Sequence, residues 1–175
     1  MARIVAAHPP FPPQVPWTNQ DIFLYHGTSD RHQASIMAGV SVSAGRSGTD
    51  FGRGYCTTTL LAQARSWAWQ LSARNPGSVP VVIRFTVSRD DLTDLESVWF
   101  VRGSTNADDF WSLIHHCRTG GADHVRKDTE WYDVSIGPVA ASWRQRLCIL
   151  DGDQINFHTQ DEADLLDRSS TAIVP

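Results

Sequence analysis

The pattern of hydrophobic and polar positions predicts strands and helices in alternation along the first half of the chain. The apolar run at 22–28 (IFLYHGT) is typical of a short buried strand, and the alternating, β-branched run at 80–87 (PVVIRFTV) predicts another. Between them, apolar residues recur every three to four positions within 60–77 and predict a helix, which Pro76 and Gly77 end.

A further helix is predicted over 29–39, where Ser29 or Asp30 is the N-cap and Gly39 the stop. The Gly- and Ser-rich stretch 41–54 has no periodicity and predicts a loop. The second half of the chain adds predicted helices at 108–121 and 161–168 and predicted strands at 131–140 and 148–159.

These elements predict an α+β or mixed architecture, because strands and helices alternate at first and strands gather later. Prolines at five of the first sixteen positions predict that residues 1–20 form an extended, proline-rich N-terminal arm. The folded domain is expected to span 21–168, with a C-terminal tail at 169–175. A chain of 175 residues with 41% hydrophobic side chains suits one such domain.

Composition narrows the classes of function. The formal net charge of -4, with 15 Lys and Arg, excludes a broad cationic surface for nucleic acid, although a local basic groove stays open. The 3 cysteines have no CxxC spacing, so neither a disulfide framework nor a cysteine-based zinc site is indicated. Without a signal peptide or a long apolar run, the sequence predicts a soluble, cytoplasmic protein that does not insert into a membrane.

Candidate chemistry gathers around His26, at the end of the first predicted strand. A lone histidine in such a place usually satisfies a backbone carbonyl, and this interpretation stays open. The neighbouring residues favour a ligand instead: Gly27 allows close approach to the backbone and Thr28 adds a hydroxyl. Gly52 and Gly54 open a second such approach beside Tyr55, in DFGRGYCTTT at 50–59.

Four ordered segments carry a resemblance to a known superfamily. They are LYHGT, DFGRGYCTTT followed by QARSWA, YDVSIGPVA, and DQINFHT, spread from residue 24 to residue 159. The first two resemble the His-Tyr-Glu branch of the ADP-ribosyltransferase superfamily. The last two look like the YDIVIGPVADD and QISFHT segments of a bacterial family of uncharacterised domains assigned to the same fold.

This resemblance implies an NAD-binding cleft in a split, mainly antiparallel sheet with flanking helices. His26 would hold a ribose hydroxyl, and the backbone of Gly27 would pair with the nicotinamide carboxamide. The nicotinamide ring would lie between aromatic side chains, and no metal would be needed. The predicted cofactor-binding set is His26, Gly27, Thr28, Gly54, Tyr55, Cys56 and Trp67, and the predicted catalytic set is His26, Tyr55 and Gln154.

The sequence departs from the family pattern at two of these positions. Aligned on FGxG, the tyrosine that should stack on nicotinamide falls on Cys56, whereas Tyr55 takes the preceding position. Because side chains alternate across a strand, Tyr55 would point to the opposite face unless a bulge intervenes, and Cys56 would line the site instead. Trp67 falls where related transferases carry a stacking tyrosine, and plain core packing on its helix is the alternative.

The catalytic glutamate of the family corresponds here to Gln154, a variant that occurs within this branch. A glutamine can hydrogen-bond a ribose hydroxyl but cannot act as a base, and an ordinary strand glutamine is the alternative. Glu130 and Asp133 are the reserve carboxylates. The family's GPVADD becomes GPVAAS, so Ala141 and Ser142 replace two aspartates.

A metal site at His115, His116, Cys117 and His124 is not expected, because adjacent residues on a helix point about 100° apart. The function expected from the resemblance is NAD-dependent mono-ADP-ribosylation of a macromolecular acceptor, with release of nicotinamide. Domains that resemble this one are suspected toxins of toxin-antitoxin or phage-defence pairs, which implies an antitoxin protein as partner. A catalytically silent module that binds NAD, ADP-ribose or a protein, or an NAD hydrolase, remain the alternatives.

Overall fold

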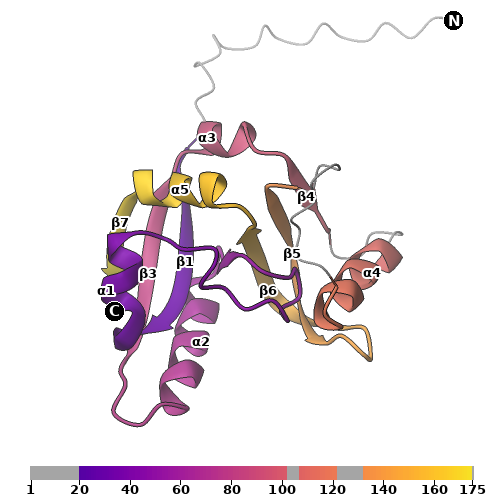
Figure 1. Ribbon diagram of the computed structural model, residues 1–175, viewed down its shortest axis with the longest axis horizontal. Coiled ribbons are helices and arrows are strands. Elements are labelled where there is room, and N and C mark those ends of the chain that lie inside the picture. Colours follow the sequence, from indigo (N-terminus) through magenta and orange to yellow (C-terminus); the bar gives the residue numbers. More distant parts are fainter. Residues whose placement is uncertain (1–19, 102–106, 122–131, 175) are drawn as a thin grey trace, which may run out of the picture.

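The computed structural model describes residues 20–101, 107–121 and 132–174, and these form an α+β protein of two sheets with flanking helices (Figure 1). The first sheet has the strand order β1-β3-β7 and is antiparallel. The second has the order β2-β6-β5-β4, and only its edge strand β4 is parallel to its neighbour. The α+β prediction is confirmed.

The strands are β1 (Ile22–Ser29), β2 (Tyr55–Thr57), β3 (Pro80–Val87), β4 (Ser97–Trp99), β5 (Val134–Ser142), β6 (Leu147–Phe157) and β7 (Ser170–Val174). The helices are α1 (Asp30–Ala38), α2 (Leu61–Ala73), α3 (Arg89–Thr93), α4 (Ala107–Arg118) and α5 (Gln160–Arg168).

Most predicted elements are present, and the exceptions are short. Ser29 is the N-cap of α1 and Gly39 ends it, as predicted. The segment assigned to a C-terminal tail instead contains β7, which pairs with β3 and so belongs to the first sheet. This part of the prediction is wrong because a strand of five residues at a sheet edge has too little pattern to show. The predicted arm lies, but for residue 20, outside the described residues.

The two sheets meet at a single pair of residues. Tyr25 of β1 and Thr58, just after β2, exchange both backbone hydrogen bonds, with N···O distances of 2.8 and 2.9 Å. No further backbone hydrogen bond links β1 to β2 in the described part of the chain. The strands therefore part beyond this pair, and the order of strands across both sheets is 7-3-1-2-6-5-4.

Three apolar clusters hold the layers together. The largest contains Leu24, Phe85 and Phe157 and includes residues of both sheets and of α5, which covers one face. A second joins Phe51 of the loop 41–54 to Phe110 and Ile114 of α4. The third presses α2 onto the other face of β1 and β3 through Ala64, Ala68 and Val82. Small alanines on α2 let this helix lie close to the sheet.

Gly27 is the point of closest approach between β1 and α2. A Cβ atom at Gly27 would overlap the carbonyl oxygen of Ala64 and lie 3.0 Å from the backbone nitrogen of Ala68. These are backbone atoms, which cannot move aside as a flexible side chain would. The glycine thus has a packing role in addition to any role in ligand binding.

We expect Gly27→Ala to lower the free energy of unfolding by about 1–3 kcal/mol, because α2 must move away from β1 to make room. Urea denaturation followed by circular dichroism measures this change. Gly48→Ala is the matched control, since a Cβ there meets nothing within 4 Å and should change stability by less than about 0.5 kcal/mol. Equal stabilities of the two variants would contradict the packing role.

Candidate functional site

His26 lies on β1 at the place where the two sheets part. Its Nδ1 is 2.7 Å from the backbone oxygen of Cys56. A carbonyl oxygen can only accept a hydrogen bond, so Nδ1 carries the proton and donates it. In the neutral ring this leaves Nε2 without a proton, as a hydrogen-bond acceptor.

The Cys56 carbonyl needs this donor because no strand reaches it. Backbone groups of successive residues point to opposite sides of a strand, so those of every second residue point to the same side, and those of Thr58 point toward β1. The carbonyl of Cys56, two residues earlier, therefore also points toward β1, which has already diverged. The imidazole donates the hydrogen bond that a backbone N–H of β1 would otherwise supply. His26 therefore does satisfy a backbone carbonyl, which was one of the two interpretations of the sequence.

The imidazole is uncharged at neutral pH. Burial lowers the pKa of His26 below its usual 6.5, and this effect exceeds the opposing effect of the bond to Cys56. The nearby His32 lowers the pKa further by charge repulsion. A neutral His26 keeps Nε2 available to accept a hydrogen bond from a hydroxyl.

Gly27 offers two unpaired backbone groups beside this imidazole. The register of β1 and β3 is regular, and Tyr25 directs its N–H and C=O to Thr58, away from β3. By the same alternation Gly27 also directs its N–H and C=O away from β3. Neither group has a backbone partner outside the β1–β3 ladder in the described ranges, so both are free to pair with an amide.

Tyr55 supports His26 from the interior. The two rings stack with centroids 4.5 Å apart. The rings of Tyr55 and Phe85 form a T-shaped pair with centroids 6.0 Å apart. Only 6% of Tyr55 is exposed, and burial raises its pKa well above 10. The β2–β6 register has no bulge, so Tyr55 points to the core face, as alternation predicted. Its catalytic and nicotinamide-stacking roles do not fit this position, because His26 and the core occupy its ring.

Cys56 lies on the opposite face of β2 and is exposed. Surrounding protein atoms nevertheless desolvate its thiol, and with the carboxylates of Asp50 and Asp153 they raise its pKa to about 12. The thiol is therefore protonated at neutral pH and is a poor nucleophile. That Cys56 lines a ligand site stays a prediction.

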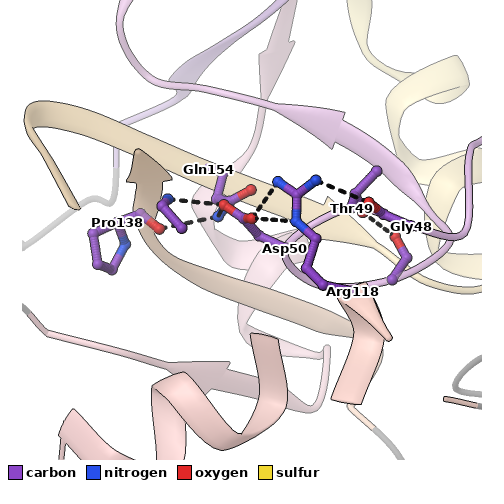
Figure 2. Close-up of polar contacts among 8 residues, drawn as sticks. Gly48, Thr49, Asp50, Arg118, Pro138 and Gln154 are labelled. Atoms are coloured by element: carbon purple, nitrogen blue, oxygen red, sulfur yellow. Dashed lines mark hydrogen bonds and ion pairs between the residues drawn. The ribbon is translucent and has the colours of Figure 1, made fainter. Parts of the chain in front are cut away.

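Gln154 lies on β6, on the same face as Cys56, in a buried polar network. Its Nε2 donates to Asp50 Oδ2 and to the carbonyl oxygen of Pro138, at 3.0 Å each (Figure 2). Gln154 does not contact His26, because the two side chains project from opposite faces of their strands. The structure therefore brings together His26, Tyr55 and the backbone of Cys56, with Gln154 on the other face.

Asp50 is the centre of this network and was not singled out from the sequence. Its Oδ1 accepts hydrogen bonds from Nε and Nη2 of Arg118, at 2.9 and 2.5 Å (Figure 2). Its Oδ2 accepts from the backbone N–H of Ala140, at 2.8 Å, and from Gln154. Asp50 is the only acidic residue between Asp30 and Asp90, a signal that could have identified it.

The remaining residues of the predicted site differ in how far they are buried and in what they contact. Gly54 packs on Asn156, since a Cβ there would lie 2.6 Å from its side chain, and Thr28 is buried. Trp67 is 51% exposed on α2, so the alternative of plain core packing is not observed, and its stacking on nicotinamide stays a prediction. Asp133 accepts from the backbone N–H of Glu96 at 2.7 Å. The other reserve carboxylate, Glu130, and the candidate ligand His124 lie outside the described residues.

Asp153 of β6 links this strand to the residues between β2 and α2 and to α2 itself. Its carboxylate accepts from the hydroxyls of Thr58 and Thr59 and from the N–H of Thr59 at 3.0 Å. The amide of Gln63 on α2 bonds both backbone groups of Asp153, at 2.7 and 3.0 Å. These contacts fix the start of α2 against β6, next to Cys56.

The described ranges contain neither a cluster of metal ligands nor a helix suited to cross a membrane. No three or more His, Cys, Asp or Glu side chains of those ranges are grouped so that they could hold a metal ion. None of the helices in the same ranges has the length and apolar character that a membrane crossing requires.

The fold and site define an α+β protein whose sheets part beside a neutral histidine. A family model described as protein of unknown function (DUF3990) matches residues 22–150, and the chain belongs to this family. The match includes His26, Tyr55 and Asp50 and stops short of Gln154. Neither a curated protein nor a solved structure matches the chain.

We expect Arg118→Met to lower the free energy of unfolding by about 3 kcal/mol, because it leaves the buried Asp50 carboxylate without its ion-pair partner. The lower end of the usual range applies because 33% of the Arg118 side chain is exposed. Arg146→Met is the matched control. It removes an ion pair to Asp108 in which the side chains are 59% and 86% exposed, and should cost less than about 1 kcal/mol. Chemical denaturation of both variants measures the difference.

Stability should fall as the pH drops from 7.5 to 5.5. Burial lowers the pKa of both His26 and His158 in the folded protein, whereas the unfolded chain titrates near 6.5. The unfolded state therefore binds protons first, and folding is most favourable above that pH. Urea midpoints across this range measure the slope, which His158→Gln should reduce. If the urea midpoint of His158→Gln changed with pH as much as that of the wild-type protein, His158 would not contribute to the pH dependence of stability.

Proposed function

We propose that this protein is an NAD-dependent mono-ADP-ribosyltransferase that modifies a macromolecular acceptor and releases nicotinamide. The single observation that carries the proposal is the state of His26: a neutral imidazole with Nδ1 fixed by Cys56 and Nε2 left as an acceptor. The next residue on β1, Gly27, has backbone groups without a partner in the described ranges. A ribose hydroxyl donates to such an acceptor, and a carboxamide matches such a backbone pair.

The strand order 7-3-1-2-6-5-4, interrupted between β1 and β2, supports an ADP-ribosyltransferase-like split sheet. The sequence resemblance implies this fold, and the break falls beside His26, where the resemblance would put the cleft. Tyr55 then acts from behind, holding the imidazole by stacking rather than touching nicotinamide. Cys56 lines the opposite face of β2.

The reaction would break the bond between the ribose C1′ and the nicotinamide nitrogen, and the electron pair would leave with nicotinamide. Positive charge then develops on the ribose, and a nucleophile of the acceptor adds to C1′ and loses its proton to solvent. The protein's part is to hold the ribose and carboxamide so that the leaving bond is exposed. The carboxylate of Asp153 is close enough to raise the pKa of the Cys56 thiol, and its negative potential favours that charge.

A second candidate function is a silent module that binds NAD or ADP-ribose without cleaving it. Gln154 favours this candidate, because it is an amide rather than a carboxylate and its N–H groups are already committed. An NAD hydrolase would use the same site with water as acceptor. If the protein is the toxin of a toxin-antitoxin or phage-defence pair, as the resemblance implies, it acts in the cytoplasm and has a protein inhibitor.

Incubation with NAD labelled in the adenylate, together with a cell lysate, tests these functions. We expect label on a macromolecule and equimolar free nicotinamide, and both should fall at least about a hundredfold in His26→Ala, which loses the Nε2 acceptor. His115→Ala, an exposed histidine on α4, is the control and should keep the activity.

The other outcomes decide between the candidates. Nicotinamide released with free ADP-ribose and no transfer would indicate the hydrolase. Binding of NAD by calorimetry without release of nicotinamide would indicate the silent module. Absence of binding and of release would contradict an NAD-dependent function altogether.

A further inference from the structure

Every group that hydrogen-bonds to the Asp50 carboxylate in the described part of the chain is a donor. Arg118 donates twice to Oδ1, and Ala140 and Gln154 donate to Oδ2. Asp50 is 3% exposed, so water does not compete for these positions. An amide in its place would turn an N–H₂ group toward donors on one side or the other. Residue 50 therefore has to be a carboxylate for all four hydrogen bonds to form.

This carboxylate determines which way the Gln154 amide is turned. The oxygen of Pro138 and Oδ2 of Asp50 can only accept, so the amide must direct Nε2 toward them (Figure 2). Oε1 then points to the other side of the amide. It has no hydrogen-bond partner among the residues that the structure describes, although Gln154 is 7% exposed.

The free oxygen lies on the face of the second sheet that carries Cys56, a residue of the predicted cofactor-binding set. Cys56 pairs with Asn156, and Gln154 is the next residue along β6 on the same face, so Gln154 is the diagonal neighbour of Cys56. Such neighbours are about 7–8 Å apart, a distance that a ribose ring and its hydroxyls can span. Asp50 is also close enough to affect the titration of the Cys56 thiol.

We propose that Asp50 is a positioning residue that holds Gln154 with Oε1 toward the ligand, so that the amide accepts a hydrogen bond from a ribose hydroxyl. The inference rests on the proposed function and assigns to Asp50 and Gln154 together the place of the family's carboxylate. The charge stays on Asp50, and its hydrogen bond polarises the amide and makes Oε1 a better acceptor. Arg118 forms an ion pair with Asp50, with Nη2 2.5 Å from Oδ1, and this pair compensates the buried charge.

This arrangement explains why residue 154 is an amide. A carboxylate at 154 would face Oδ2 of Asp50 at about hydrogen-bonding distance, and two carboxylates so close share one proton. It would also face the Pro138 oxygen with no proton to donate. An amide at residue 50 would supply a donor to such a glutamate and so relieve the repulsion between the two side chains, although not the repulsion from the Pro138 oxygen.

Three variants test the inference: Gln154→Glu, Asp50→Asn, and the double variant that carries both changes. Steady-state release of nicotinamide gives kcat and KM, calorimetry gives NAD affinity, and circular dichroism reports folding. We expect Gln154→Glu to remain folded and to lose at least about tenfold in kcat with little change in KM. The double variant restores a donor at 50 and an acceptor at 154, and should regain at least about threefold over Gln154→Glu.

Asp50→Asn alone is the least informative of the three, since it can fail to fold. The double variant carries the same change, so circular dichroism must show that it is folded before its kcat is compared with that of Gln154→Glu. Asp108→Asn is the matched control, because Asp108 forms an exposed ion pair with Arg146 and lies outside the site. Its kcat should match the wild type.

Two results would overturn the inference and leave the proposed function intact. One is a Gln154→Glu variant as fast as the wild-type protein, which would show that the amide is not required. The other is a folded double variant no faster than Gln154→Glu, which would show that Asp50 does not orient residue 154. A wild-type protein that neither binds nor cleaves NAD would remove the proposed function and this inference together.

Discussion

The parting of β1 from β2 beyond the Tyr25–Thr58 pair is the constraint on which the rest of the site depends. Two antiparallel strands that stayed paired would satisfy all their backbone groups and leave nothing for a ligand. Because they separate after one pair, the carbonyl of Cys56 and both backbone groups of Gly27 lose their partners. Buried backbone groups without partners are costly, so each must find a substitute.

The structure supplies a substitute donor for the Cys56 carbonyl and leaves the backbone groups of Gly27 without a partner in the described ranges. His26 donates to the Cys56 carbonyl, and this bond fixes its tautomer, while Tyr55 stacks on the ring and the core desolvates it. The same contacts that make His26 a structural residue thus make Nε2 an acceptor. A structural role and the proposed functional role of His26 are therefore compatible, because the bond to Cys56 also leaves Nε2 as an acceptor.

Sequence patterns predicted most of the fold because the longer elements are regular. The periodicity within 60–77 and the apolar runs at 22–28 and 80–87 depend on local sequence only, and all three elements are present. Strands β2, β4 and β7 have at most five residues each and owe their existence to a neighbouring strand. Tyr55 is an example: because adjacent residues of a strand face opposite sides, the sequence predicted that Tyr55 would face away from Cys56.

The site could be predicted only where its residues are close in sequence. His26 and Gly27 are adjacent and were found, whereas Asp50 and Arg118 are 68 residues apart and meet only through the packing of α4 on the loop 41–54. No local pattern joins them. Gln154 was found through its motif, but the bond from its Nε2 to Oδ2 of Asp50 joins it to a residue that no motif identified. The chemistry at 154 is consequently a property of the network, and an amide held by a buried carboxylate is a different group from a free glutamine.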